Sequence, residues 1–178
     1  YPSLRETYSD YFDIGVAVNP ATVSGEYYPD LICRQFSSIT NENNLKPDTI
    51  IDKNATLSDT ENNGTRLVLD FSKVSSELDF AVANNLKVRG HTLIWHSQTP
   101  EWIFYENFDP EGELASRELM LTRMENYIHD VFTFADTNYP GLFYAWDIVN
   151  EAVDDSGGLR NSLWRQTIGD DYIEQAFA

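Results

Sequence analysis

The chain has 178 residues, of which 42% are hydrophobic, and this length and composition are those of one folded domain. Twelve Lys and Arg residues against 29 Asp and Glu residues give a formal net charge of -17, which would repel phosphate backbones and anionic membranes. Nucleic acid is therefore a poor candidate partner. Because the apolar runs stay well short of the roughly 20 residues that a spanning helix needs, we expect no membrane span.

The amino-terminal part of the sequence predicts two short strands, each beside a helix. A helix over residues 3–9 leads to IGVAV at residues 14–18, which has the pattern of a strand buried on both faces. A helix over residues 28–36 then precedes a second strand at residues 37–40. Residues 41–66 are mostly polar and rich in turn formers, which predicts a long loop on a functional face.

The rest of the chain continues the same alternation. Asp70 is a candidate cap for a helix that ends at Asn84, and KVRGHTLIW at residues 87–95 predicts a third strand. A further helix carries its apolar stripe at Met120, Met124, Tyr127, Ile128 and Val131. The fourth strand begins at Phe143, and a last helix is expected over residues 170–178.

This order of strands and helices is typical of an α/β fold with a parallel sheet and right-handed crossovers. One candidate architecture for this sheet is open and doubly wound, but no glycine-rich phosphate loop follows any of the strands. The other is a (β/α)8 TIM barrel, which needs about 250 residues. On that interpretation the chain supplies about the first four β/α units.

The stretch FYAWDIVNEAVDD, residues 143–155, places an amide and a carboxylate at the end of the fourth strand. Partial burial beside this apolar strand would raise the pKa of Glu151 and suit it to act as a general acid. A solvated loop carboxylate beside Asp154 and Asp155 is an equally simple interpretation. Asn150 is a candidate donor to a substrate hydroxyl, or else a turn residue that satisfies its own backbone.

Polar and aromatic side chains also gather at the ends of the second and third strands. His91, Trp95, His96 and Gln98 combine hydrogen-bonding groups with an aromatic plate, a mixture that suits sugars. The two histidines lack a nearby third ligand, so we expect neither a metal nor a cofactor. The second strand is followed by Glu42, Asn43 and Lys46, which taken alone are a solvated charge cluster.

Three motifs together resemble a known family. WDIVNEAVDD, with RGHTLIWHSQTPEW and ITNENNLKP upstream, is similar to the amino-terminal half of glycoside hydrolase family 10, the endo-β-1,4-xylanases with a (β/α)8 barrel. The resemblance covers nearly the whole chain. It implies that Glu151 is the general acid/base and that Asn150 holds a sugar beside the cleavage point. It further implies that the sugars are contacted by His91, Trp95, Gln98, Glu42, Asn43 and Lys46.

The resemblance also implies a second carboxylate, because the family retains configuration and needs a nucleophile roughly 5 Å from the acid. That residue comes from a later strand and lies outside this sequence. We therefore expect residues 1–178 to be the amino-terminal half of one catalytic barrel, completed by a second polypeptide or a further segment. A free half-barrel would expose its inner face and its strand edges.

The function expected on this basis is retaining hydrolysis of internal bonds in xylan, by a secreted or cell-surface enzyme that also binds xylo-oligosaccharides. Two alternatives stay open from the residues alone. One is a non-catalytic carbohydrate-binding half, and the other is a β-1,4-glucanase with the same fold.

Overall fold

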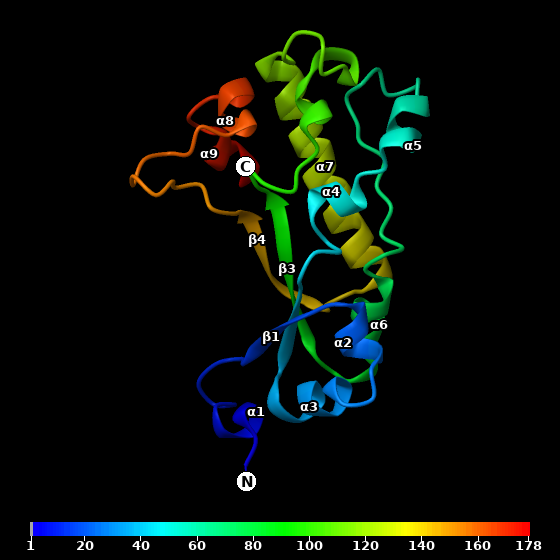
Figure 1. The fold of residues 1–178 in the computed structure, drawn as a ribbon, viewed down its shortest axis with the longest axis vertical. Helices are drawn as coiled ribbons and strands as arrows, with labels where there is room; N and C mark the ends of the chain where they lie inside the picture. The colour runs from blue at the N-terminus through cyan, green and yellow to red at the C-terminus, as the bar shows by residue number, and fades with distance from the viewer. Residues whose placement is uncertain (1) are drawn as a thin grey trace. The chain divides into compact units, whose positions relative to one another are not determined.

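The computed structural model describes residues 2–178. Its strands are β1 (Gly15–Val18), β2 (Ser38–Asn41), β3 (Lys87–Ile94) and β4 (Phe143–Val149) (Figure 1). Its α-helices are α1 (Leu4–Thr7), α2 (Pro20–Ser24), α3 (Tyr28–Gln35), α4 (Pro47–Ile50), α5 (Lys53–Ser58), α6 (Ser75–Ala83), α7 (Arg117–Asn138), α8 (Leu163–Ile168) and α9 (Tyr172–Ala176). Two short 3-10 helices are η1 (Glu101–Phe104) and η2 (Glu106–Phe108).

Within the described residues the strands form one sheet in the order β1-β2-β3-β4. β1 pairs with β2 in parallel, with Gly15 opposite Ser38, and β2 pairs with β3 in parallel, with Ser38 opposite Lys87. Neighbours in the sheet are neighbours in the sequence and are joined through helices, as in a β/α barrel. The predicted alternation and the parallel sheet are confirmed.

The chain consists of two compact units. The first comprises Tyr1–Leu45, Phe71–His91 and Phe134–Asp147. The second comprises Lys46–Asp70, Thr92–Thr133 and Ile148–Ala178.

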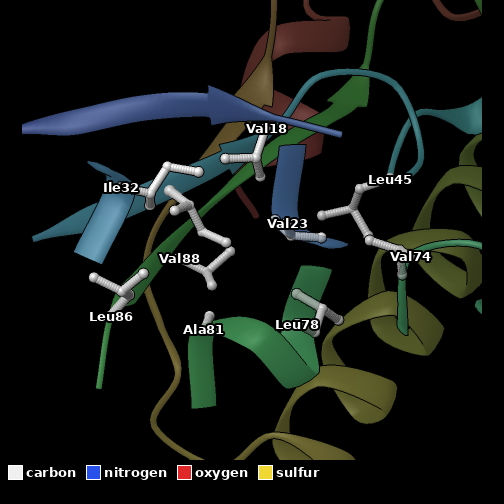
Figure 2. Close-up of a cluster of buried hydrophobic side chains, with 10 residues drawn as sticks. Val18, Val23, Ile32, Leu45, Val74, Leu78, Ala81, Leu86 and Val88 are labelled. Carbon is white, nitrogen blue, oxygen red and sulfur yellow. The ribbon is translucent and has the colours of Figure 1, made fainter. Parts of the chain in front are cut away.

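The core of the first unit lies between the strands and helices α2, α3 and α6. Figure 2 shows side chains from these elements pointing toward one another. Val88 on β3 and Leu78 on α6 are fully buried there, and Val18 on β1 is 1% exposed. Removing these apolar surfaces from water is the main stabilising term for the unit.

Two details of the first unit differ from the predictions. β1 was expected to be buried on both faces, yet Gly15 and Ala17 are exposed. Helix α2, which was not predicted, follows β1, because Asn19 accepts a hydrogen bond from the Thr22 amide at 3.1 Å and Pro20 takes the first helical position.

A buried arginine organises the second unit. Arg123 on α7 is 1% exposed and donates to the carbonyls of Gly64, Ile103 and Tyr105 at 2.7, 2.7 and 2.9 Å. Burial lowers the pKa of Arg123 to about 10. The guanidinium therefore ties η1 and the 64–65 turn to α7. The predicted apolar stripe of α7 is confirmed for Met120, Met124, Tyr127 and Val131, which are all buried.

Three further features of the chain differ from the predictions. The long loop expected over residues 41–66 contains α4 and α5, and α5 starts where Asp52 accepts from the Ala55 amide at 2.9 Å. Asp70 is not the N-cap of α6, because this helix begins only at Ser75 and Val74 takes the N-cap position. Helix α8 was not predicted, although Ser162 caps it.

Candidate functional site

Strands β3 and β4 end side by side in the second unit. The Asn150 amide donates to the Ile94 carbonyl at 2.9 Å, one step beyond the last residue of β4. The two paired strand ends therefore place the residues that follow, Trp95 and Glu151, close to each other. Rigid strand ends are suitable places to hold reacting groups.

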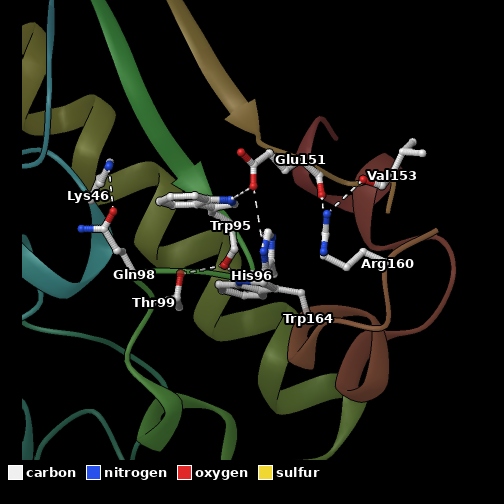
Figure 3. A network of polar contacts seen from close by, with 9 residues as sticks. All are labelled: Lys46, Trp95, His96, Gln98, Thr99, Glu151, Val153, Arg160 and Trp164. Carbon is white, nitrogen blue, oxygen red and sulfur yellow. Dashed lines mark hydrogen bonds and ion pairs between the residues drawn. The ribbon is translucent and has the colours of Figure 1, made fainter. Parts of the chain in front are cut away.

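Glu151 projects its carboxylate toward the end of β3 (Figure 3). Trp95 Nε1 donates to Glu151 Oε2 at 2.9 Å, and His96 Nε2 lies 3.9 Å from the same oxygen. The Glu151 side chain is 53% exposed, so about half of its surface is accessible to solvent. Its backbone has φ 51°, which is uncommon for a residue with a Cβ atom.

The main chain of Trp95 is held by two side-chain hydrogen bonds. Its carbonyl accepts from the Trp164 indole at 3.2 Å and from the Thr99 hydroxyl at 2.8 Å. Trp164 is 2% exposed and packs edge-on against Phe104, with ring centroids 4.8 Å apart. The buried α8 residue therefore anchors the segment that carries the Glu151 hydrogen-bond donor.

Lys46 and Gln98 lie on the other side of Trp95. Lys46 Nζ donates to Gln98 Oε1 at 2.7 Å and lies 4.9 Å from the centroid of the Trp95 ring. Lys46 is only 7% exposed, so its ammonium group is held in one place rather than solvated. The solvated-cluster interpretation is therefore wrong for Lys46. The structure brings Lys46, Trp95, Gln98, Asn150 and Glu151 together in one unit.

The other predicted site residues belong to the first unit. Glu42 directly follows β2, where its amide donates to the Val18 carbonyl at 2.8 Å and its Oε2 accepts from Asn19 Nδ2 at 2.9 Å. Asn43, the next residue, is exposed. His91 lies on β3, with Nδ1 at 2.9 Å from Asp147 Oδ2.

Asp147 was not predicted as a functional residue. It accepts from Arg89 at 2.6 Å and contacts His91 with its other oxygen. The contact with Asp147 Oδ2 orients the His91 ring on β3. The signal in the sequence was a single carboxylate inside the apolar strand FYAWDIV.

Sequence reasoning also missed Arg160 and Trp164. Both lie in the segment after Glu151, which carries no recognisable catalytic pattern. Among residues 2–178, no cluster of three or more His, Cys, Asp or Glu side chains has a geometry that could hold a metal ion. In that same part of the chain, no helix is long and apolar enough to cross a membrane.

Comparison with known proteins decides the family. Residues 3–178 match the family described as Glycosyl hydrolase family 10. The chain belongs to this family. The predicted resemblance is therefore confirmed, and with it the fold class, in which the chain supplies about four β/α units of a TIM barrel.

Curated relatives within the family include xylanases. The chain is 42% identical to endo-1,4-beta-xylanase B of Butyrivibrio fibrisolvens over 98% of its own length and 27% of that protein. It is 40% identical to an endo-1,4-beta-xylanase of Geobacillus stearothermophilus over 99% of its length and 47% of that protein. The chain thus spans about half or less of these relatives.

Solved structures of this family have the same backbone arrangement. The xylanase 10B modules of Clostridium thermocellum, complexed with xylohexaose, match with a TM-score of 0.87 and 37% identity over 98% of this chain and 36% of that chain. The intracellular xylanase TsXylA of Thermoanaerobacterium saccharolyticum, complexed with xylotetraose, matches with a TM-score of 0.83 and 40% identity over 99% and 52%.

Proposed function

We propose that this chain is the amino-terminal half of the catalytic barrel of an endo-1,4-β-xylanase, which hydrolyses internal bonds of xylan with retained configuration. Family membership and the xylanase relatives support the proposal. The observation that carries it is the hydrogen bond from Trp95 Nε1 to Glu151 Oε2 at the paired ends of β3 and β4. This bond fixes a carboxylate where a barrel enzyme holds its reacting groups.

Glu151 acts as the general acid and then as the general base. In the first step the protonated carboxyl donates to the departing glycosidic oxygen, and in the second the carboxylate takes a proton from the attacking water. Trp95 Nε1 and His96 Nε2 both contact the carboxyl group at Oε2, so we assign proton transfer to Oε1. The Trp95 N–H bond strengthens as Glu151 becomes anionic, which stabilises the charge that develops during bond cleavage.

A second carboxylate completes the reaction. A retaining glycosidase needs a nucleophile about 5 to 5.5 Å from the acid/base, and it forms the covalent glycosyl-enzyme intermediate. We propose that this residue belongs to a segment outside the 178 residues, supplied by the same polypeptide or by a second one. That segment also covers the inner face of the strands and so completes a single barrel.

The remaining site residues bind sugar. In the second unit, Lys46 and Gln98 offer hydrogen-bonding groups beside the flat face of Trp95, and Asn150 adds an amide next to Glu151. In the first unit, Glu42, Asn43 and His91 also bind sugar. These groups match a ligand with many hydroxyls and apolar ring faces, which is the chemistry of xylan and xylo-oligosaccharides.

We also propose that the enzyme works outside the cell or on its surface, because xylan is a polymer too large to enter intact. One similar protein is an intracellular xylanase, so location needs its own measurement. Activity against xylan in washed cells and in culture fluid, compared with lysed cells, tests this point. Activity found only after lysis would contradict it.

The proposed activity is tested with the full-length protein on beechwood-type xylan and on soluble cellulose. We expect reducing sugar from xylan at a rate well above that from cellulose, and loss of about 10²–10⁴-fold with Glu151→Gln. Asp155→Asn is the matched control, since Asp155 is an exposed carboxylate in the same loop. Faster release from cellulose would overturn the substrate assignment. Calorimetric binding of xylo-oligosaccharides without any release would indicate a binding protein.

A further inference from the structure

The segment after Glu151 folds back as a small hairpin. The Arg160 amide donates to the Ala152 carbonyl at 2.8 Å, Val153 and Leu159 form an antiparallel bridge, and the Asp154 amide pairs with the Gly158 carbonyl at 2.9 Å. Asp154 closes the tip by accepting from the Ser156 amide and hydroxyl, and these bonds lower the pKa of Asp154. The hairpin therefore brings Arg160 back beside the main chain of Glu151.

The Arg160 side chain lies at the base of this hairpin (Figure 3). Its Nε donates to the Glu151 carbonyl at 3.1 Å, and its Nη2 donates to the Val153 carbonyl at 3.3 Å. The planar guanidinium presents both donors in one rigid fork. A lysine at this position would offer a single point donor and could not hold two carbonyls in a fixed relation.

Glu151 needs such support because of its backbone. Its φ of 51° lies in the left-handed region, where a Cβ atom crowds the main chain. On one side, the Asn150 amide is fixed to the Ile94 carbonyl of β3 at 2.9 Å. On the other side, Arg160 fixes the carbonyl that follows the Glu151 Cα atom. Together the two contacts set the direction of the Cα–Cβ bond, and hence of the carboxyl group.

We propose that Arg160 is a positioning residue for the acid/base, which keeps Glu151 in the left-handed conformation that directs its carboxyl group toward Trp95 and the glycosidic oxygen. The inference rests on the proposed function of Glu151 and adds a role for a residue outside the predicted site. Arg160 acts through the main chain and transfers no proton. Its loss leaves the carboxyl group present but misaligned for proton donation.

The test compares aryl β-xylobiosides that have aglycones of similar size but different leaving-group acidity. A 2,4-dinitrophenolate departs without protonation, whereas a phenolate needs the acid, so kcat/KM for the phenyl glycoside reports proton donation. In the full-length protein we expect Arg160→Met to lower kcat/KM for the phenyl glycoside by about 10-fold or more, and for the dinitrophenyl glycoside by less than about 3-fold. Arg160→Lys should fall between wild type and Arg160→Met.

Arg165→Met is the matched control. Arg165 donates to the Leu159 carbonyl of the same hairpin at 2.7 Å and pairs with Asp170, but it does not contact Glu151. We expect it to leave the ratio of the two kcat/KM values at the wild-type level. The ratio of the two kcat/KM values is independent of the fraction of folded enzyme. A poorly folded variant therefore still shows whether proton donation has changed.

Two results would overturn the positioning role. Equal losses on both glycosides would show that Arg160 supports only the fold or sugar binding, and unchanged values for Arg160→Met would show that Glu151 needs no support from it. A wild-type protein that cleaves neither glycoside would instead overturn the proposed function, and the positioning role with it.

Discussion

The indole Nε1 of Trp95 donates a hydrogen bond to Glu151 Oε2 over 2.9 Å, and it joins two residues that are 56 positions apart in the sequence. Trp95 directly follows β3, and Glu151 is the second residue after β4. The bond exists because those strands pair through Asn150 and Ile94. A sheet contact thus sets the geometry of the proposed acid/base.

Replacing Trp95 by Phe keeps a ring at this position and removes the donor. A hydrogen bond to a charged group contributes about 1.5–3 kcal/mol, so we expect kcat/KM on xylan to fall by about 10-fold or more in the full-length protein. Steady-state kinetics with wild type and Trp95→Phe measure the change. A variant within twofold of wild type would show that Glu151 does not depend on this donor.

Lys46 gives a prediction about binding. Its buried ammonium lies between Gln98 and the Trp95 ring, so Lys46→Met removes a charged donor from the proposed sugar site. In a Glu151→Gln background that prevents turnover, we expect xylo-oligosaccharide affinity to fall by about 10-fold or more by calorimetry. Lys53→Met is the control, because Lys53 is exposed at the start of α5. Equal affinities for the two variants would contradict a role for Lys46 in binding.

The strands and the long helix could be predicted because their signal is local. β-branched and aromatic runs define β3 and β4, and the spacing of Met120, Met124 and Tyr127 defines α7. The short helices α2, α4, α5 and α8 were missed because they have too few turns to show periodicity. Their signals are caps and proline positions, such as Asn19, Asp52 and Ser162.

The proposed site likewise contains residues that could be predicted from the sequence and contacts that could not. Residues next to strand ends, such as Glu151 and Trp95, could be selected from the sequence because parallel strands bring their carboxyl ends together. The contact of Asp147 with His91 and that of Arg160 with the Glu151 carbonyl depend on strand register and on a positive φ. Neither property is encoded in a short motif. The catalytic and binding roles themselves stay predictions.

The ion pair of Arg117 with Asp171 predicts a dependence of stability on pH. The hydrogen bond from Arg117 lowers the pKa of Asp171 to about 2. Since the unfolded carboxyl titrates near 4, the pair stabilises the fold above about pH 4, and this contribution is lost as pH falls toward 2. We expect Asp171→Asn to lower Tm at pH 7 and to have almost no effect near pH 2. A Tm difference that persists unchanged at pH 2 would contradict this assignment.

Leu78 tests the core of the first unit. It is fully buried on α6, whereas Val82 on the same helix is 57% exposed. Leu78→Ala leaves a cavity and should lower the free energy of unfolding by about 2–5 kcal/mol, measured by denaturant titration of the full-length protein. Val82→Ala is the control, with an expected change within about 0.5 kcal/mol. Similar effects for both variants would place Leu78 outside a packed core.

The central claim is that Glu151 is the acid/base of a retaining xylanase. Its most direct test is the reaction of full-length Glu151→Ala with a dinitrophenyl β-xylobioside in the presence of azide. The acid is not needed to form the glycosyl-enzyme from this substrate, but the missing base slows its hydrolysis, and azide needs no base. We predict faster turnover with azide and a β-xylobiosyl azide product. No acceleration by azide, or an azide product of inverted configuration, would contradict the role of Glu151.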